Sequence, residues 1–264
     1  MRALDISWRD EFEPLVAPAL RLLSNRLTGL TVGARSADAA GAGRFATSLA
    51  LLTALTRLHL RDDGLAAGGT QALVPALSAL SHLADLRLSA NDLADDGAAA
   101  LAPPLALLTA LTCLDLHHNF IGPDGAAALA PALSRLSQLA ALRLHRNTLF
   151  SDGIEALAPA LSLLTKLTQL YLHDNALFYE GAEALAPALG RLVRLEHLNL
   201  QDNEMEDGLH FLVPALARLT ALRNLAIVYH NHASGQAVLA FRAGVPASVW
   251  EASDFEDWCL GCVP

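Results

Sequence analysis

Leucine returns along this chain at a fixed spacing, and this spacing dominates the pattern of hydrophobic and polar positions. The motif Leu-x-x-Leu-x-Leu begins at Leu55 and recurs every 28 residues, with a final interval of 27. A constant period of this length indicates a solenoid of stacked repeats. Eight units start at Leu27, Leu55, Leu83, Leu111, Leu139, Leu167, Leu195 and Leu222.

Each unit combines a strand pattern with a helix pattern. In residues 114–116 the two Leu side chains point to one side of an extended strand and the residue between them points to the other. Leu129, Leu133 and Leu136 then follow at helical spacing. One unit buries too little apolar surface to balance the entropy of ordering it, so stacking on its neighbours must supply the rest. The expected core of this unit is Leu111, Leu114, Leu116, Ile121, Leu129, Leu133 and Leu136.

Two polar or helix-breaking columns keep the same period. An Asn follows each central strand, and we expect its side chain to bond backbone groups of the adjacent turn, because buried amides and carbonyls need partners. A Pro recurs within the helical half, where Pro131 lies about 200° around the helix from Leu129 and should therefore face solvent. The Asn column is Asn91, Asn119, Asn147, Asn175 and Asn203, and the Pro column is Pro75, Pro103, Pro131, Pro159, Pro187 and Pro214.

These columns resemble the leucine-rich-repeat family, whose signature is L-x-x-L-x-L-x-x-N-x-L. The 28-residue period and the Ala/Leu-rich second half are similar to the ribonuclease-inhibitor-like subclass over roughly residues 15–232. The resemblance implies an α/β horseshoe, with a parallel sheet on the concave face and helices on the convex face. It implies binding rather than a particular partner, because one scaffold serves unrelated functions.

The two ends depart from the repeat, as the caps of a solenoid must. We expect residues 1–26 to form an N-terminal helical cap, with an amphipathic helix over residues 10–23. Residues 27–232 carry the repeats. Residues 233–264 are expected to form a C-terminal cap and an acidic tail containing Trp, all within a single structural domain.

The outward positions of the strands should line one concave surface that is polar and mixed in charge. Arg and Tyr are the expected anchors for a protein partner, because they combine contact area with directed hydrogen bonds. A solenoid also needs a polar concave face to remain soluble, so polarity alone does not prove binding. The expected contact residues are Arg57, His59, Arg61, Arg87, Asp115, His117, Arg143, His145, Arg146, Tyr171, His173 and Asn199.

Three His residues stand at the same position of consecutive units: His117, His145 and His173. Imidazoles on adjacent strands could bind a transition metal or respond to acidification. Repeat duplication explains the same pattern without any site. A ladder also spreads its nitrogens along a line, whereas metal ligands must converge on one point, so no metal and no cofactor is expected.

Composition narrows the class of partner and the compartment. The formal charge is −9 and the pI is about 5.5, which argue against a nucleic-acid surface or an anionic membrane. Three cysteines cannot build a disulfide framework, and no apolar signal segment is visible at the N-terminus. We therefore expect a cytoplasmic protein that is a monomer on its own.

The C-terminal segment holds a lone Cys-x-x-Cys formed by Cys259 and Cys262. With His230 and His232 it could form a zinc site, or the two thiols could form a redox pair, although no thioredoxin-like context surrounds them. Two thiols in a capping tail are the simplest interpretation. The acidic residues interleaved with Trp250, Phe255 and Trp258 could also serve as a docking peptide for a basic partner.

No motif for catalysis is visible in the sequence. It lacks a Gly-rich phosphate loop, a G-x-S-x-G nucleophile turn, an H-E-x-x-H zinc motif and the kinase motifs. We expect a non-catalytic protein-binding scaffold or recognition module that uses the concave face. The resemblance leaves two alternatives, a regulator of a small GTPase similar to Ran GTPase-activating proteins and the sensor portion of an immune-type receptor.

Overall fold

One parallel sheet follows the order of the sequence from end to end. The computed structural model describes residues 3–8, 22, 26–34, 39–61, 64–227 and 231. Each strand pairs in parallel with the next along the chain, and equivalent Leu residues stand opposite one another, as Leu86 and Leu114 do. The nine strands are β1 (Ala3–Trp8), β2 (Gly29–Ala34), β3 (Arg57–Arg61), β4 (Asp85–Arg87), β5 (Cys113–Asp115), β6 (Ala141–Arg143), β7 (Gln169–Tyr171), β8 (His197–Asn199) and β9 (Asn224–Ala226).

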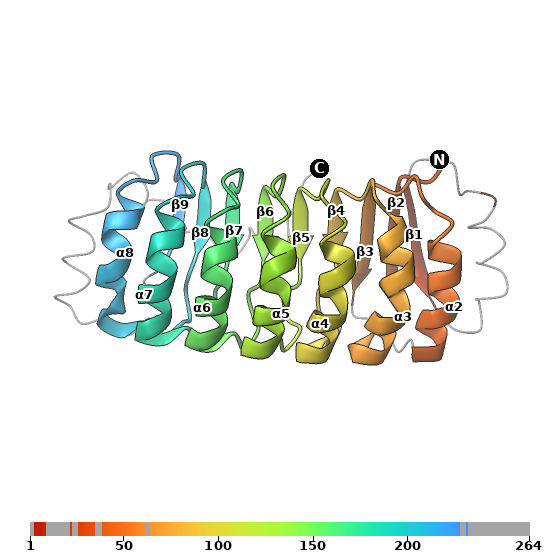
Figure 1. The fold of residues 1–264 in the computed structure, drawn as a ribbon, viewed down its shortest axis with the longest axis horizontal. Helices are drawn as coiled ribbons and strands as arrows, with labels where there is room; N and C mark the ends of the chain where they lie inside the picture. Colours follow the sequence, from red (N-terminus) through yellow and green to blue (C-terminus); the bar gives the residue numbers. More distant parts are fainter. Residues whose placement is uncertain are drawn as a thin grey trace.

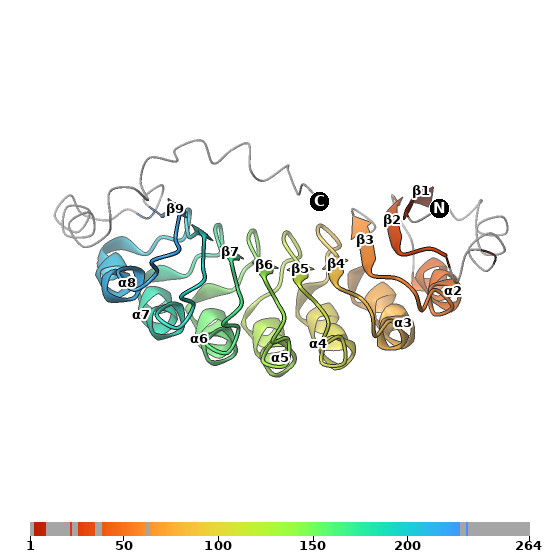
Figure 2. The ribbon, with the colours of Figure 1, turned by 90° about the horizontal axis from the view of Figure 1, so that it is seen from above.

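The helices form a second layer on one side of this sheet. Figure 1 shows them side by side in chain order. Seen from above, the strands lie on the inner side of a curve and the helices on its outer side (Figure 2). The predicted α/β leucine-rich-repeat solenoid with a concave sheet is thus confirmed. The helices are α2 (Ala39–Leu49), α3 (Ala66–Ala79), α4 (Ala94–Leu105), α5 (Pro123–Leu133), α6 (Phe150–Leu161), α7 (Phe178–Leu189) and α8 (Leu209–Leu216), and a 3-10 turn, η2 (Glu206–Gly208), precedes α8.

Strand β1 lies where the sequence analysis placed a helical cap, so the sheet has one strand more than the eight expected units. Leu4 pairs in register with Leu30, and Ile6 pairs with Val32. The alternation of Leu4 and Ile6 carries the strand signal, but its spacing of 26 residues from the next unit departs from the 28-residue period. The predicted helix that follows lies outside the described residues, apart from Leu22.

The core consists of stacked layers of leucine between sheet and helices. All seven aliphatic side chains expected to fill the unit that begins at Leu111 are buried. The six Pro residues of the periodic column are all exposed, as predicted for Pro131, whereas Pro104 beside them in α4 is buried. Each apolar edge therefore faces inward, and the helix-breaking residue faces water, where a freed backbone carbonyl can be hydrated.

The Asn column forms a ladder of hydrogen bonds along the solenoid, as expected. Asn119 Nδ2 donates to the backbone oxygens of Leu88 at 2.7 Å and Leu116 at 3.0 Å. Its own backbone N–H donates to Asn147 Oδ1 at 3.0 Å, and Oδ1 of Asn119 accepts from the N–H of Asn91 at 2.8 Å. Each Asn thus satisfies backbone groups of two neighbouring units, which an apolar side chain could not do.

The ladder extends by one Asn that the sequence analysis did not include. Asn231 Oδ1 accepts from the N–H of Asn203 at 3.1 Å, and Asn231 Nδ2 donates to the backbone oxygens of Leu200 and Ile227. Asn231 follows Ile227 by four positions, whereas Asn203 follows Leu200 by three. This extra residue compensates for the 27-residue interval between the strands, so Asn231 keeps the 28-residue spacing of the Asn column.

Helix α5 begins with a cap supplied by the preceding repeat. Asp95 Oδ1, from the first turn of α4, accepts from the N–H groups of Gly122 at 2.7 Å and Gly125 at 2.8 Å. A β-carbon on Gly125 would lie 2.6 Å from that oxygen, so only glycine allows the approach. The carboxylate also lies where the helix macrodipole favours negative charge.

Among the residues with a described structure, no helix has both the length and the apolarity needed to cross a membrane.

Candidate functional site on the concave face

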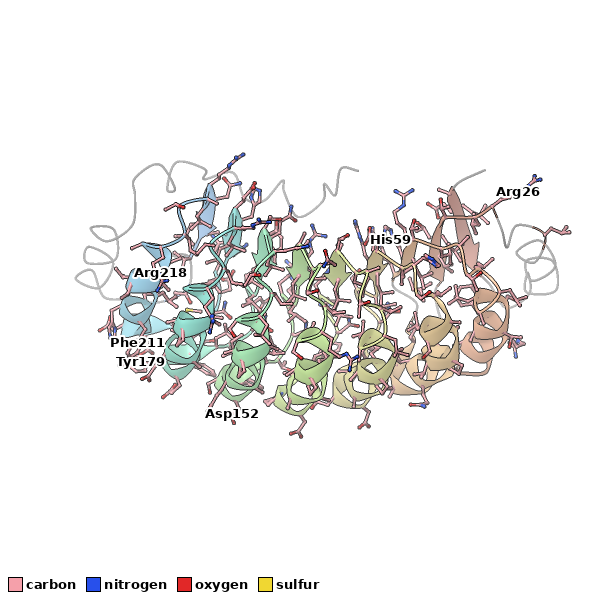
Figure 3. The ribbon with its side chains drawn as sticks, turned by 45° about the horizontal axis from the view of Figure 1, so that its top comes forward. Arg26, His59, Asp152, Tyr179, Phe211 and Arg218 are labelled. Atoms are coloured by element: carbon pink, nitrogen blue, oxygen red, sulfur yellow. The ribbon has the colours of Figure 1, made fainter. Side chains whose placement is uncertain are left out.

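The concave face is built from alternate residues of the strands and from the residue that follows each strand's second Leu. The Leu residues of these strands point into the core, so the residues between them point out of it. His59, labelled in Figure 3, marks the N-terminal part of this surface, on the strand side of the molecule. The short strands place equivalent positions of neighbouring repeats next to one another, which brings residues about 28 apart in sequence into contact.

In the N-terminal part, Asp85 binds the side chains of His59 and Arg87. His59 Nε2 lies 3.0 Å from Asp85 Oδ2, and Arg87 donates from Nε to Oδ1 and from Nη2 to Oδ2, each at 3.0 Å. Burial raises the pKa of Asp85, but the hydrogen bonds from His59 and Arg87 outweigh this effect and hold the pKa well below its usual range. Arg87 is thus fixed in a two-point contact rather than free to move.

In the central part, Asp115 plays the same role for His117 and Arg143. His117 Nδ1 lies 2.6 Å from Asp115 Oδ1, and Arg143 Nη1 lies 3.9 Å from Asp115 Oδ2. The Arg143 guanidinium also stands over the ring of Tyr171, 5.3 Å from its centroid, and donates to Gln169 Oε1 at 3.3 Å. Burial raises the pKa of Asp115, but the hydrogen bond with His117 outweighs this effect, so the pKa of Asp115 is lowered.

The three His residues form a stack of nearly parallel rings. The centroid of His145 lies 4.3 Å from that of His117 and 4.2 Å from that of His173, with interplanar angles of 10° and 15°. His145 and His173 are buried, and the Nδ1 atom of each has no hydrogen-bond partner. Their nitrogens lie in parallel planes and do not converge on a point, and no cluster of potential metal ligands occurs among the described residues.

Burial keeps the two buried rings of the stack, His145 and His173, uncharged. It lowers the pKa of His173 to about 4, and it lowers that of His145 well below its usual range, with repulsion from His173 and His117 adding to the effect. A charged imidazole at either position would need a hydrogen-bond acceptor at a buried Nδ1 that has none. His145 and His173 are therefore neutral at pH 7.

We expect the protein to lose stability as the pH falls from 7.5 to 5. A buried His whose pKa is lowered on folding takes up a proton more readily in the unfolded chain, where its pKa is about 6.5. The stability is therefore complete above that value and is lost as the pH falls toward the folded pKa of about 4. For His173 alone the loss at pH 5 is about 2 kcal/mol, and His145 adds to it in the same direction.

Urea denaturation at pH 7.5 and pH 5.0 measures this loss. Asp85 and Asp115 remain ionised across the window, because their pKa values lie below the usual range. The variant His145→Gln/His173→Gln should show a much smaller pH dependence, whereas His82→Gln, at an exposed position, should behave as the wild type. Equal stability of the wild type at both pH values would show that the rings are not held neutral.

The structure places the twelve predicted contact residues at three levels of accessibility. Ion pairs and ring stacking cover the deeper side chains, so the accessible ones are the cationic residues at the rim and above the buried carboxylates. Arg57, Arg61 and Arg146 are exposed; His59, Arg87, His117 and Arg143 are half-buried; Asp115, His145, Tyr171, His173 and Asn199 are buried.

The sequence places Asp85 and Gln169 on the concave surface, but neither was among the expected contact residues. Both stand one residue before the central Leu of their strands, and each contacts cationic side chains of the predicted surface. Asp85 shares its strand with Arg87 and lies beside the strand of Arg57, so an ion pair at this position was predictable. Cys113 occupies the same column, where burial raises its pKa to about 12 and makes the thiol unreactive. His230, His232, Cys259 and Cys262 lie outside the described residues.

Comparison with known proteins identifies the repeat. The family model described as Leucine Rich repeat matches residues 79–102 and 108–130. A search of curated proteins finds no match.

Two solved structures are similar to this chain at low identity. One is the crystal structure of a TLR13–ssRNA13 complex, with 20% identity and a TM-score of 0.43 over 86% of this chain and 40% of that chain. Another is an internalin, inlF, from Listeria monocytogenes str. 4b F2365, with 17% identity and a TM-score of 0.36 over 87% of this chain and 75% of that chain. The chain thus spans less than half the length of the TLR13 chain. With its nine parallel strands, its Asn ladder and the two matched segments, the described part of this chain has the fold of a leucine-rich-repeat solenoid.

Proposed function

We propose that this protein is a non-catalytic recognition module that binds a protein partner through its concave face. The observation that carries this proposal is the pair of carboxylates, Asp85 and Asp115, that hold Arg87, His117 and Arg143 in position. Side chains fixed before binding lose little entropy when a partner arrives, which favours affinity. A face kept polar only for solubility needs no such arrangement.

The chemistry of the face indicates which groups the partner supplies. The exposed members of the predicted contact set are all Arg, and the carboxylates that balance deeper cations are the half-buried Asp85 and the buried Asp115. The partner surface should therefore present hydrogen-bond acceptors, such as carboxylates or backbone carbonyls, to Arg61 and Arg146. Arg is a frequent anchor in protein interfaces because it combines several donors with a large contact area.

The same proposal covers the subclass of the repeat, the cellular location of the protein and its oligomeric state. A 28-residue period with a full helix in most units supports the ribonuclease-inhibitor-like subclass. The small number of cysteines supports a cytoplasmic location. The net negative charge supports a monomer that does not bind nucleic acid. The absence of a catalytic motif in the sequence supports a role in binding rather than in a reaction.

Capture of partners from a lysate of the source organism tests this function. The test variant is Arg57→Ala/Arg61→Ala/Arg146→Ala, which removes three exposed concave side chains and leaves the buried layer intact. The matched control is Arg135→Ala/Lys166→Ala/Arg194→Ala, which removes three exposed cations from the segments that follow helices α5 to α7. A protein retained by the wild type and the control, but lost by the concave variant, is the expected result. Equal recovery with the concave variant would show that binding uses another surface.

A further inference from the structure

Aromatic side chains are almost absent from the core and gather instead on one edge of the solenoid. Of the Phe and Tyr residues with described side chains, Phe45 is buried in the core and Tyr171 is buried on the concave face. Phe120, Phe150 and Tyr179 expose 55%, 41% and 40% of their surfaces. These three lie where the chain passes from a strand into the next helix, so exposure of aromatics is confined to that side of each repeat.

Four rings form two neighbouring pairs, which we together call the aromatic edge: Phe150 with Phe178, and Tyr179 with Phe211. Phe150 and Phe178, the first residues of α6 and α7, have parallel rings with centroids 6.3 Å apart. Tyr179 meets Phe211 of α8 edge to face, with centroids 5.1 Å apart. Figure 3 shows Tyr179 and Phe211 beside one another on the helix side of the molecule, where Asp152 also lies.

The backbone at two of these positions disfavours a large side chain. Phe150 and Phe178 have φ of 53° and 58°, in the left-handed region that Asn and Gly tolerate best. Ala66 and Ala94 occupy the equivalent position in earlier repeats. Packing of the core does not require an aromatic ring there. Rings held in a strained conformation and exposed to water point to contact with another molecule.

The surroundings of the aromatic edge are strongly acidic. Residues 147–155, 175–183 and 203–211 together contain seven carboxylates and no Lys or Arg. Carboxylates near helix N-termini stabilise the helix macrodipole, which accounts for part of this pattern. That effect does not account for the exposed rings among them. Together, aromatic faces and carboxylates are complementary to a cation with a flat, weakly hydrated head group.

A groove between α6 and α7 continues from this edge. It has a volume of about 560 Å³ and is lined on its apolar walls by Ala158, Pro159 and Pro187. Glu155, Glu180 and Glu183 line it as well, and Arg191 belongs to its lining at the C-terminal end of α7. An extended peptide laid along the edge could therefore place one side chain in the groove while others cover the rings.

We propose that the aromatic edge and this groove bind an arginine-rich segment of a partner protein. A guanidinium group can stack on Phe150 or Tyr179 while donating hydrogen bonds to Glu180 or Glu183, which combines cation–π and charge-assisted contacts. Lysine makes only the ionic part of this interaction well, because its ammonium is compact and strongly hydrated. This surface is separate from the concave face and does not depend on the proposed function.

Fluorescence anisotropy with a labelled octapeptide of alternating Arg and Ser tests the proposal on the full chain. Peptides with citrulline or Lys in place of Arg serve as probes of charge and of guanidinium geometry. The first variant is Phe150→Asn/Tyr179→Ser, because Asn suits the left-handed backbone and should leave thermal stability unchanged or raised. The second is Glu180→Gln/Glu183→Gln. Controls are Leu107→Ser/Leu163→Ser, exposed on the opposite side of the repeats, and Asp92→Asn/Asp96→Asn on the distant acidic turn of α4.

We expect the wild type and both controls to bind the Arg peptide alike, and each test variant to bind it at least about tenfold more weakly. The Lys peptide should bind more weakly than the Arg peptide, and the citrulline peptide should not bind. Equal loss in Asp92→Asn/Asp96→Asn would overturn the proposal in favour of nonspecific charge attraction. Three further results would also overturn it. The first is no binding by the wild type, and the second is a large loss of thermal stability in Phe150→Asn/Tyr179→Ser. The third is self-association of the wild type that Phe150→Asn/Tyr179→Ser abolishes.

Discussion

Replacing Asn147 by alanine is expected to lower the free energy of unfolding by about 3 kcal/mol or more. Asn147 Oδ1 accepts from the backbone N–H groups of Asn119 and Ile121, both at 3.0 Å. Its Nδ2 donates to the backbone oxygens of Leu116 at 3.1 Å and Leu144 at 2.9 Å. The carbonyls of Leu116 and Leu144 also accept hydrogen bonds from Asn119 and Asn175, respectively, so they keep a partner in the variant. The N–H groups of Asn119 and Ile121 lose their acceptor, and this loss accounts for most of the decrease in stability.

Urea denaturation of the purified variant measures this effect. Gln138→Ala is the matched control, because it removes an amide side chain from an exposed position and should change stability by less than about 0.5 kcal/mol. A loss below about 1 kcal/mol for Asn147→Ala would mean that water replaces the side chain and that the ladder does not stabilise the turns.

Replacing Leu144 by alanine is expected to cost about 2–5 kcal/mol. Leu144 exposes 1% of its surface and lies in a central layer, so neighbouring repeats on both sides restrict collapse of the cavity. The lost transfer free energy and the cavity both contribute, and in a solenoid the damage extends to the interfaces with two adjacent units.

The same denaturation experiment applies here, with Leu163→Ala as the control. Leu163 is also a leucine of a central repeat but exposes 54% of its surface, so its truncation should be nearly neutral. If the two variants lose similar amounts of stability, the inward column of leucines is not the core of this protein.

The sequence was sufficient to predict the features that depend on a fixed period. Leu114, Leu129 and Leu133 are buried, Pro131 is exposed and Asn119 bonds backbone groups of its neighbours, because each role follows from position within one repeating unit. Stacking then repeats the same geometry along the chain. Such features need no knowledge of distant contacts.

Departures from the period were harder to predict. Strand β1 lies 26 residues before its neighbour, so it falls outside a search at constant spacing. Asn231 keeps the 28-residue spacing from Asn203, but it follows Ile227 by four positions instead of three, so the motif around it departs from the pattern. In each case the structure keeps the register of the sheet or the ladder and absorbs the change in a loop.

The sequence predicted which face of the solenoid carries the candidate site, but it did not predict how the side chains on that face are arranged. The spacing places His145, His173 and Tyr171 on the concave face, yet their burial depends on side-chain rotamers and ring stacking, which a spacing does not specify. The roles of Asp85 and Asp115 likewise depend on contacts across strands, with His59 and Arg143 respectively. The aromatic edge depends on backbone conformation at Phe150 and Phe178, which the repeat pattern does not reveal.

The most direct test of recognition through the concave face is the affinity of a captured partner for the variants, measured by calorimetry. We expect Arg57→Ala/Arg61→Ala/Arg146→Ala to weaken binding at least about tenfold. The control Arg135→Ala/Lys166→Ala/Arg194→Ala should bind as tightly as the wild type. The opposite pattern, with unchanged affinity in the concave variant and a loss in the control, would contradict the proposed function.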